Sequence, residues 1–366
     1  MPTIAAAIKV LEELAPPSYQ ESYDNCGLLV GYAAAECKGI LCTLDATEDV
    51  IAEAIEKGCN LVVAHHPIIF GGLKKITGRN YVERTVIAAI KNDIAIYAIH
   101  TNLDNLLTGV NGKMADKLGL ENRKVLLHRQ NNLLKLAVFV PEADADKVRE
   151  AIFKAGGGNI GKYSECSFNI KGTGTFKAGE GTNPHIGEIG KREEANEEKI
   201  EVILPVYKRD VVVEAMLEAH PYEEVAYDVV ALTNYFQEVG SGLYGELPEP
   251  MVEKDFLNMV KEQFGLQALK HTPLMGKPVK TVALCGGAGS FLIKNALGAK
   301  ADIYITSDIK YHEFFDAEGR MVIADIGHYE SEQFTVDLLH DVLEANFPNF
   351  AVLKSGVRTN PVQYFM

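Results

Sequence analysis

The chain contains 366 residues, of which 47% are hydrophobic and 23% charged, as in ordinary folded water-soluble proteins. At roughly 150 residues per domain, this length predicts two or three domains. The formal net charge of −14 argues against a nucleic-acid or anionic-membrane partner, because both require a basic surface, but it leaves room for a small phosphorylated ligand bound locally.

The first segment, MPTIAAAIKVLEELAPP, does not read as a signal peptide, because no basic start precedes the apolar run and two glutamates interrupt it. No stretch of 18 uninterrupted apolar residues occurs, so no membrane span is expected. The six cysteines form no CxxC pair, which favours reduced thiols over a cysteine metal site. We therefore expect a cytoplasmic protein.

Helices and strands alternate over the first 125 residues. Apolar spacing predicts a helix at 3–14, and Thr47 is placed to cap a second helix that ends at Gly58. The further predicted elements are strands at 38–47, 59–67 and 94–104 and a helix at 80–93. This alternation is typical of βαβ units around a parallel sheet.

The order of the predicted helices and strands changes between residues 126 and 235. The predicted elements are strands at 133–141, 167–176, 199–206 and 223–232 and helices at 145–156 and 209–219. This order suits a small ferredoxin-like α+β module, and HPYEEVAYDV (220–229) reads as part of an ordinary edge strand. The stretch 177–199 holds several glycines and alternating charges, so we expect a mobile loop there.

The alternation of strands and helices typical of βαβ units resumes after residue 236. Residues 276–315 read strand, turn, helix, strand and polar end, which is also the order in 38–70. Either the two stretches form a weak internal repeat or the likeness is chance. We predict an α/β fold class: a discontinuous two-lobed α/β domain built from repeated βαβ units (1–125 and 236–366), with a ferredoxin-like α+β domain inserted at 126–235.

Three predicted strands end in imidazoles and carboxylates. The motifs are HHP, with His65 and His66; HTNLD, with His100 and Asp104; and GHYESE, with His328 and Glu332. His328 and Glu332 are four residues apart, a spacing that places both on one helical face. Ligands of open α/β sheets bind beyond the carboxyl ends of the strands, so we expect the three motifs at one rim.

Imidazole and carboxylate groups without cysteine suit Zn, Mn, Fe, Co or Ni. Adjacent histidines on extended backbone point apart, so His65 and His66 suit two neighbouring ions, with a carboxylate such as Glu332 placed to bridge them. Two neighbouring metal ions of this kind activate water for hydrolysis. A single histidine at a strand end is more often structural, and a single His/Glu pair is usually a solvated helix face; the three motifs together favour metal binding.

Other candidates carry weaker signals. Asp308 and His312 follow the strand-like ADIYITS, where they would support metal ligands or handle substrate; a helix cap by Ser307 or Asp308 is the alternative. CGGAGS (285–290) offers backbone amides for a phosphate, or a tight turn. DNCGLLVG (24–31) contains turn-forming residues, and nothing in it is chemically required.

Several motifs, in order, resemble the Nif-three-like family, whose members are named GTP cyclohydrolase I type 2 homologs: YDNCGLLVG, LDAT, VAHHPIIF, IHTNLDN, CGGAGS, ITSDIKYHE and GHYESE. The resemblance covers about 1–125 and 236–366. The segment 126–235, with HPYEEVAYDVVAL, resembles the PII-like (CutA-like) domain that longer bacterial members carry. The family implies a toroidal hexamer, a trimer of dimers, with its sites facing an internal cavity.

The resemblance also implies two divalent metal ions per subunit. Their ligands would be His65, His66, Asp104, His328 and Glu332, with the glutamate bridging. The functional hypothesis is metal-dependent hydrolysis of a phosphorylated or nucleotide substrate, with His100, Asp308 and His312 as acid/base or supporting candidates. The alternative is a metal-binding regulatory protein with a ligand-sensing insert. The sequence specifies neither guanine nor the metal.

Overall fold

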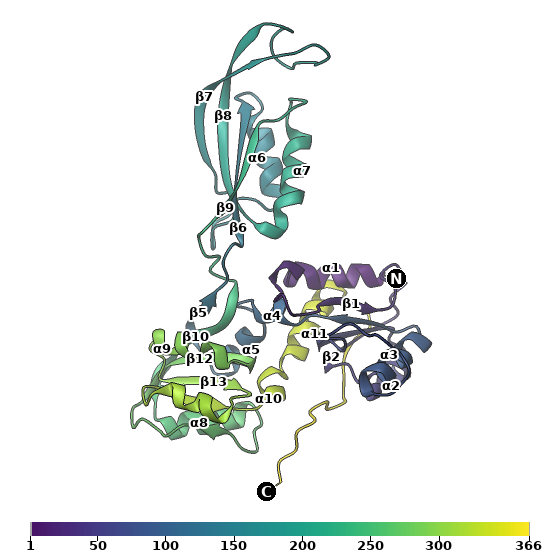
Figure 1. Ribbon diagram of the computed structural model, residues 1–366, viewed down its shortest axis with the longest axis vertical. Helices are drawn as coiled ribbons and strands as arrows, with labels where there is room; N and C mark the ends of the chain where they lie inside the picture. The colour runs from purple at the N-terminus through teal and green to yellow at the C-terminus, as the bar shows by residue number, and fades with distance from the viewer. Residues whose placement is uncertain (1, 366) are drawn as a thin grey trace. The chain divides into compact units, whose positions relative to one another are not determined.

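Two compact units make up the chain. Met1–His128 and Glu238–Met366 form the discontinuous unit, and Arg129–Gln237 form the inserted unit. The sequence predicted 126–235 for the insert. The computed structural model describes residues 2–365 and shows a mixed α/β fold, as predicted (Figure 1). No helix among the described residues is long and apolar enough to span a membrane.

The first sheet of the discontinuous unit has the strand order β1-β4-β3-β2-β15. Its strands are β1 (Gly27–Val30), β2 (Ile40–Asp45), β3 (Leu61–His66), β4 (Ala95–Ala98) and β15 (Val352–Lys354). All neighbouring pairs are parallel except β1 with β4. The flanking helices are α1 (Ile4–Leu14), α2 (Glu48–Glu56), α3 (Tyr81–Lys91) and α11 (Thr335–Asn346).

Helices cover both faces of this sheet. Side chains of α1 and α11 pack on one face, and those of α2 and α3 pack on the other. A sheet buried on both sides needs continuous apolar strands, which explains LVVA at 61–64. The side chain of Thr47 accepts a hydrogen bond from the amide of Val50 and so caps α2, as predicted.

The second sheet has the order β11-β14-β13-β12-β10-β5. Its strands are β5 (Glu121–His128), β10 (Gly240–Met251), β11 (Lys270–His271), β12 (Val279–Ala288), β13 (Ile303–Ser307) and β14 (Val322–Asp325). Strands β12, β13 and β14 are parallel, and the other pairs are antiparallel. The helices α5 (Val110–Lys117) and α8 (Glu253–Gln263) cover one face, and α9 (Ile293–Gly298) covers the other.

The two sheets share a strand order. In each, three successive parallel strands are followed by an antiparallel edge strand beside the third, giving β2-β3-β4 with β1 and β12-β13-β14 with β11. The remaining short elements are α4 (Thr101–Asp104), α10 (His328–Glu332) and the 3₁₀ turns η1 (Pro17–Tyr19), η3 (Ser290–Leu292) and η4 (Tyr311–Ala317). Polar motifs thus follow corresponding strands of both sheets.

The predicted strand 94–104 was too long. β4 ends at Ala98, and the HTNLD motif begins the helical turn α4 instead. The carbonyl of His100 accepts from the amides of Leu103 and Asp104, and the amide of His100 donates to the Asn102 side chain. Polar side chains that bond to nearby backbone in this way end strands and favour turns.

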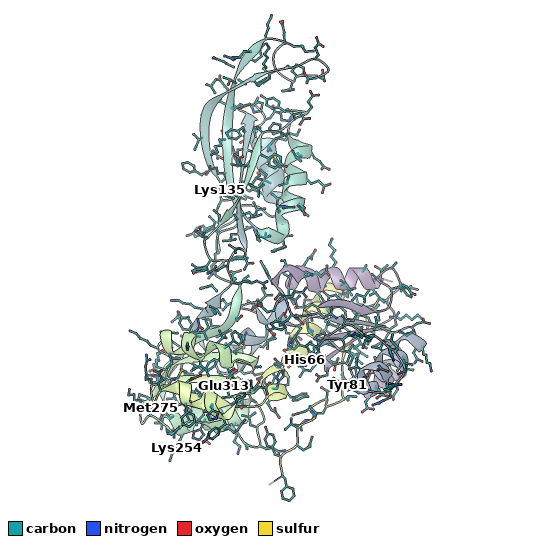
Figure 2. All side chains as sticks on the ribbon, viewed as in Figure 1. His66, Tyr81, Lys135, Lys254, Met275 and Glu313 are labelled. Carbon is teal, nitrogen blue, oxygen red and sulfur yellow. The ribbon has the colours of Figure 1, made fainter. Side chains whose placement is uncertain are left out.

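The inserted unit is an antiparallel sheet in the order β7-β8-β6-β9. Its elements are β6 (Leu133–Pro141), α6 (Ala145–Lys154), β7 (Phe168–Lys177), β8 (Arg192–Pro205), η2 (Val206–Lys208), α7 (Arg209–Ala219) and β9 (Tyr227–Leu232). Both helices cover one sheet face. On the other face, Lys135, which is labelled in Figure 2, projects from the sheet. It forms an ion pair with Glu201 at 3.1 Å.

Two predictions for this unit were wrong in extent. The predicted mobile loop 177–199 is strand from Arg192 onward, because β8 pairs with β7 as a long ribbon. The predicted strand 223–232 begins only at Tyr227, because the residues before it fold against the sheet through His220 and Tyr222.

Candidate metal centre

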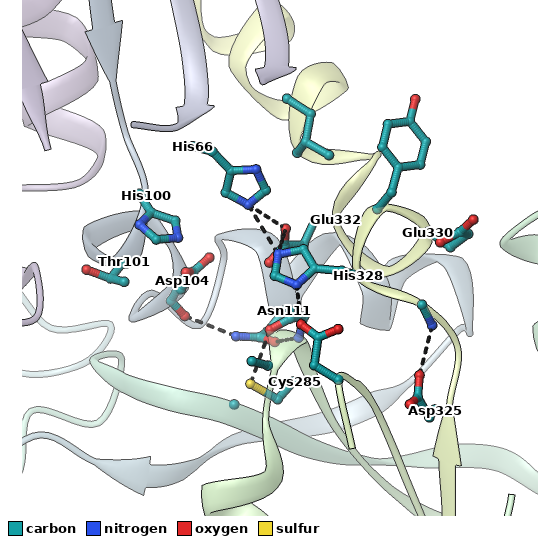
Figure 3. Close-up of a pocket in the computed structure, with 18 of the residues that line it drawn as sticks. His66, His100, Thr101, Asp104, Asn111, Cys285, Asp325, His328, Glu330 and Glu332 are labelled. Carbon is teal, nitrogen blue, oxygen red and sulfur yellow. Dashed lines mark hydrogen bonds and ion pairs between the residues drawn. The ribbon is translucent and has the colours of Figure 1, made fainter. Parts of the chain in front are cut away.

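Imidazoles and carboxylates from three segments converge in the discontinuous unit (Figure 3). His65 and His66 end β3, Asp104 ends α4, and His328 and Glu332 lie on α10 after β14. The potential ligand atoms form three groups, each with all its atoms within 4.8 Å of one another: His66/His328/Glu332, His65/Asp104/Glu332 and His65/His66/His100. The structure thus brings together all five residues that the sequence predicted as ligands, with His100 beside them.

The first group centres on Glu332. Its Oε2 lies 2.9 Å from His66 Nε2 and 3.1 Å from His328 Nε2. The two imidazole nitrogens are themselves only 3.3 Å apart. Two nitrogen lone pairs at this distance repel unless a proton or a cation lies between them, so these three atoms form a cation-binding arrangement.

The second group leaves buried polar atoms without partners. His65 Nε2 lies 3.5 Å from Asp104 Oδ1 and 4.0 Å from Glu332 Oε1. His65 Nε2 and Asp104 Oδ1 are buried and have no hydrogen-bond partner among the described residues. A buried unsatisfied polar atom costs about 1–3 kcal/mol. These two atoms, with Glu332 Oε1 beside His65, fit a bound cation.

Each ligand histidine is held from behind at Nδ1. His65 Nδ1 donates to the carbonyl of Ile99 at 2.8 Å. His66 Nδ1 bonds to Asp45 Oδ1 at 2.8 Å, and His328 Nδ1 to Asp308 Oδ2 at 2.6 Å. Because these oxygens accept hydrogen bonds, they keep the hydrogen on Nδ1 and turn Nε2 toward the shared centre. The same arrangement orients metal-ligating histidines in known sites.

The electrostatics of the protein's own groups favour positive charge at the centre. Burial lowers the pKa of His66, but hydrogen bonds to Asp45 and Glu332 outweigh it and raise that pKa to about 10. Burial is likewise outweighed at His328, where Asp308 and Glu332 raise the pKa to about 11. A divalent ion would supply this positive charge in place of the protons.

The pKa values of His65 and Glu332 are shifted in directions that suit metal ligation. Complete burial lowers the pKa of His65 to about 3, so its Nε2 keeps a lone pair at neutral pH. Burial raises the pKa of Glu332, yet bonds to His328 and His66 hold it well below its usual value, so the carboxylate is ionised. Both groups are therefore in the protonation state that metal ligation requires.

Glycine in CGGAGS makes room for the bridging candidate. Gly287 has a φ of +65°, and a Cβ there would lie 2.3 Å from Glu332 Oε1. Its amide donates to Ser331 Oγ, and the amide of Gly286 donates to Asn111 Oδ1. Because both amides have partners inside the protein, close approach explains these glycines and the phosphate-binding interpretation is wrong for them.

His100 is held by the carboxylate of Asp24, which was not predicted to have a role. Asp24 accepts hydrogen bonds from His100 Nδ1 at 2.8 Å, from the Thr101 amide at 3.0 Å and from Cys26 Sγ at 3.0 Å. Burial raises the pKa of Asp24, but these bonds lower it overall, so it stays ionised. The DNCGLLVG stretch is therefore chemically engaged, contrary to the sequence-based interpretation.

The two remaining candidates, Asp308 and His312, do not lie at the same site. Asp308 supports His328, as expected for a residue next to the ligands, and sits at a φ of +56°. His312 lies on the exposed turn η4, where its ring stacks on Phe315 at 6.3 Å, and it does not line the pocket around the ligands. The left-handed turn at Asp308 redirects the chain, which explains why the two residues do not share a site.

The C-terminal segment (355–365) crosses this region and had no sequence signal. Thr359 Oγ1 donates to Asp45 Oδ2 at 2.5 Å, and Asn360 Nδ2 donates to Glu330 Oε1 at 2.8 Å. Asp45 in turn holds His66, so Thr359 acts on a ligand through one carboxylate. The segment also lines the surrounding pocket of about 1050 Å³ through Asn360, Pro361, Val362 and Tyr364.

The family model for Duf34/NIF3 (NGG1p interacting factor 3) matches residues 2–361. The chain belongs to the DUF34/NIF3 family. It is 41% identical over 363 residues to a GTP cyclohydrolase 1 type 2 homolog of Halalkalibacterium halodurans, covering 98% of this chain and 97% of that one. It is 39% identical to the Bacillus subtilis protein of the same name, covering 88% and 87%.

A solved structure is similar over the whole chain. The Bacillus cereus protein related to NIF3 superposes with a TM-score of 0.89 at 37% sequence identity, covering 100% of this chain and 99% of that chain. The family resemblance read from the motifs is therefore confirmed.

Proposed function

We propose that this protein binds two divalent metal ions and uses them for hydrolysis. The supporting observation is that two donor groups share one buried carboxylate, Glu332, while His65 and Asp104 keep unsatisfied atoms beside it. One ion would be held by His66, His328 and Glu332, and the other by His65, Asp104 and Glu332. The donor set, without cysteine, accepts Zn, Fe, Mn, Co or Ni.

A pair of divalent ions would supply Lewis-acid activation of water at neutral pH and electrostatic stabilisation of a developing oxyanion. The chain's own contribution beyond ligation is His100. Asp24 fixes the proton on His100 Nδ1, which leaves Nε2 to accept a proton from the attacking water. The ring centroid of His100 lies 5.3 Å from those of His65 and His66, so this acceptor adjoins the ligands.

The pocket supports a flat, largely uncharged substrate portion. Aromatic side chains line it, including Tyr23, Phe70, Phe291 and Tyr329. Among its described lining residues only Lys270 carries a fixed positive charge, and Asp325 pairs with it at 2.6 Å. A nucleotide would therefore place its base against the rings and depend on the ions to neutralise its phosphates.

The metal assignment is tested with Glu332→Gln, with exposed Glu344→Gln as the matched control. Elemental analysis of purified, metal-loaded protein should give two ions per chain for the wild type and the control, and one or none for Glu332→Gln. Two ions retained in Glu332→Gln would show that the glutamate does not bridge.

Hydrolysis is tested with GTP, because the relatives named above carry the name GTP cyclohydrolase 1 type 2 homolog. Metal-loaded protein is incubated with GTP, and formate and fluorescent pterin products are followed. Turnover that Glu332→Gln abolishes supports the enzyme. If no turnover occurs with any of the five metals, the cyclohydrolase hypothesis is excluded, whereas the proposal of metal binding is unaffected.

The second candidate is a metal-binding regulatory protein whose insert senses a ligand. The inserted unit has its own hydrophobic core, which suits a separate binding module. We also propose that the insert is ferredoxin-like and PII-like, that the discontinuous unit is a two-lobed βαβ repeat, and that the cytoplasmic chain forms a toroidal hexamer. The hexamer rests on the family resemblance, and mass photometry would test it.

A further inference from the structure

The inserted unit contains a second cavity, of about 430 Å³, which the proposed metal chemistry does not use. Its walls come from β6, the β7–β8 hairpin and the 220–226 turn, all within this unit. Four rings line it: Phe139, Phe176, His185 and Tyr222. A cavity of this size suits a small organic ligand.

Tyr222 is the fixed wall of the cavity. Its hydroxyl donates to Glu197 Oε1 at 3.1 Å, and its amide donates to His220 Nδ1 at 3.0 Å. His220 Nε2 donates in turn to the carbonyl of Phe139 at 3.0 Å. The ring centroid of Tyr222 lies 6.0 Å from that of Phe176 and 6.1 Å from that of His185, at interplanar angles of 59° and 55°. The rings are therefore inclined around one space rather than stacked flat.

The charge of the lining is negative. Glu197, Glu223 and Glu224 contribute carboxylates, whereas Lys177 is the one lysine or arginine among the described lining residues. The Glu197 carboxylate lies directly over Gly174, where a Cβ would come within 2.1 Å of it. A glycine at this strand position thus admits the carboxylate to the cavity.

We propose that this cavity binds an organic cation with an alkylated ammonium head. Aromatic faces attract such heads through the ring quadrupole, and methylated ammonium is easily removed from water. The carboxylates add Coulomb attraction. A compact hydrated metal ion would gain nothing from the rings, a neutral apolar molecule nothing from the carboxylates, and an anion would be repelled.

Choline and its neutral isostere 3,3-dimethylbutan-1-ol separate these cases, because they share shape and differ in charge. Binding to the full-length protein is measured by isothermal titration calorimetry and by chemical shifts of the ligand methyl protons. Choline should bind, and the isostere should bind about 5- to 30-fold more weakly. Equal affinities, or no choline binding at millimolar concentration, would overturn the proposal.

Matched variants locate the site. Phe176→Leu should weaken choline binding about 5- to 30-fold, whereas Phe168→Leu, on the same strand but outside the cavity, should leave it unchanged. Glu223→Gln should weaken it less and in a salt-dependent way, since the exposed Glu223 carboxylate contributes charge. Choline binding that survives both Phe176→Leu and Glu223→Gln would place it elsewhere. Metal content should not change in any variant, so this test is independent of the metal proposal.

Discussion

The candidate metal centre and the cavity of the inserted unit contain the same residue types in different arrangements. In the candidate metal centre, Nδ1 of His66 and of His328 bonds to a supporting carboxylate, and Nε2 faces the shared centre. In the inserted unit, both nitrogens of His220 are engaged by the backbone, at Phe139 and Tyr222. What lies behind a histidine, rather than its position in a motif, therefore decides whether it can bind a ligand.

The carboxylates follow the same rule. Glu332 is buried, and its Oε2 lies 2.9 Å from His66 Nε2 and 3.1 Å from His328 Nε2, so a cation between these atoms would complete its surroundings. Glu197 accepts from the Tyr222 hydroxyl and lies beside aromatic rings, so it acts as one charged wall among several. The first arrangement suits a small divalent transition-metal ion, and the second suits a larger organic cation whose charge is shielded by methyl groups.

The largest expected effect comes from removing the space that Glu332 occupies. Gly287→Ala should lower metal affinity by at least about 100-fold, because both the positive φ and the Cβ contact oppose the native geometry. Gly276→Ala is the matched control, since Gly276 also has a positive φ, +71°, but no atom within 4 Å of the added Cβ. Competition with a chromogenic chelator measures both; equal affinities would refute the steric role of Gly287.

Removing the support behind one ligand should have an intermediate effect. Asp45→Asn weakens the hold on His66 Nδ1 and should lower metal affinity about 10- to 100-fold. Cobalt substitution gives a readout independent of activity, because the visible absorption of Co²⁺ reports ligand geometry. An unchanged cobalt spectrum and affinity would mean that Asp45 does not orient His66.

A smaller effect on metal affinity should come from Thr359, which contacts Asp45 rather than a candidate ligand. Thr359→Val removes the hydroxyl that bonds Asp45 while keeping the side-chain shape, and should lower metal affinity by about 3- to 10-fold. Thr359→Ser retains the hydroxyl and should restore the wild-type value. Failure of serine to restore it would assign the effect to packing.

Replacing His220 of the inserted unit should leave the metal content of the protein unchanged. His220→Phe keeps the ring but leaves the Phe139 carbonyl and the Tyr222 amide without their partner, which should destabilise this unit by about 1–3 kcal/mol. Faster hydrogen exchange at the amides of β6 and β9 would measure the loss. Reduced metal content in this variant would show that the two sites are coupled.

The sequence predicted that the five candidate ligands would lie together because their motifs follow the carboxyl ends of apolar strands, where short-range pattern and sheet geometry agree. Asp45, Asp24 and Thr359 escaped prediction for a physical reason. Their roles depend on partners 21, 76 and 314 residues away, and no local pattern marks such pairs. Gly287 escaped because a tight turn and a close approach look alike in sequence.

Prediction also failed where local conformation overrides pattern. His312 was predicted near the candidate ligands because its motif follows a strand, but the left-handed residue Asp308 redirects the chain. β8 was assigned in part to a loop because charged residues occupy both faces of its first half, so the strand has no apolar alternation to reveal it.

The two facing histidines of the centre, His66 and His328, are 262 residues apart in the chain. At the usual pace of protein synthesis, roughly 5–20 residues per second, His66 leaves the ribosome on the order of 10–50 s before its counterpart. The early ligands therefore spend that interval without the carboxylate that joins the two donor groups. If the proposed metal binding holds, any ion acquired in the meantime would be weakly held and exchangeable, and the final metal would be selected only after Glu332 has joined the site.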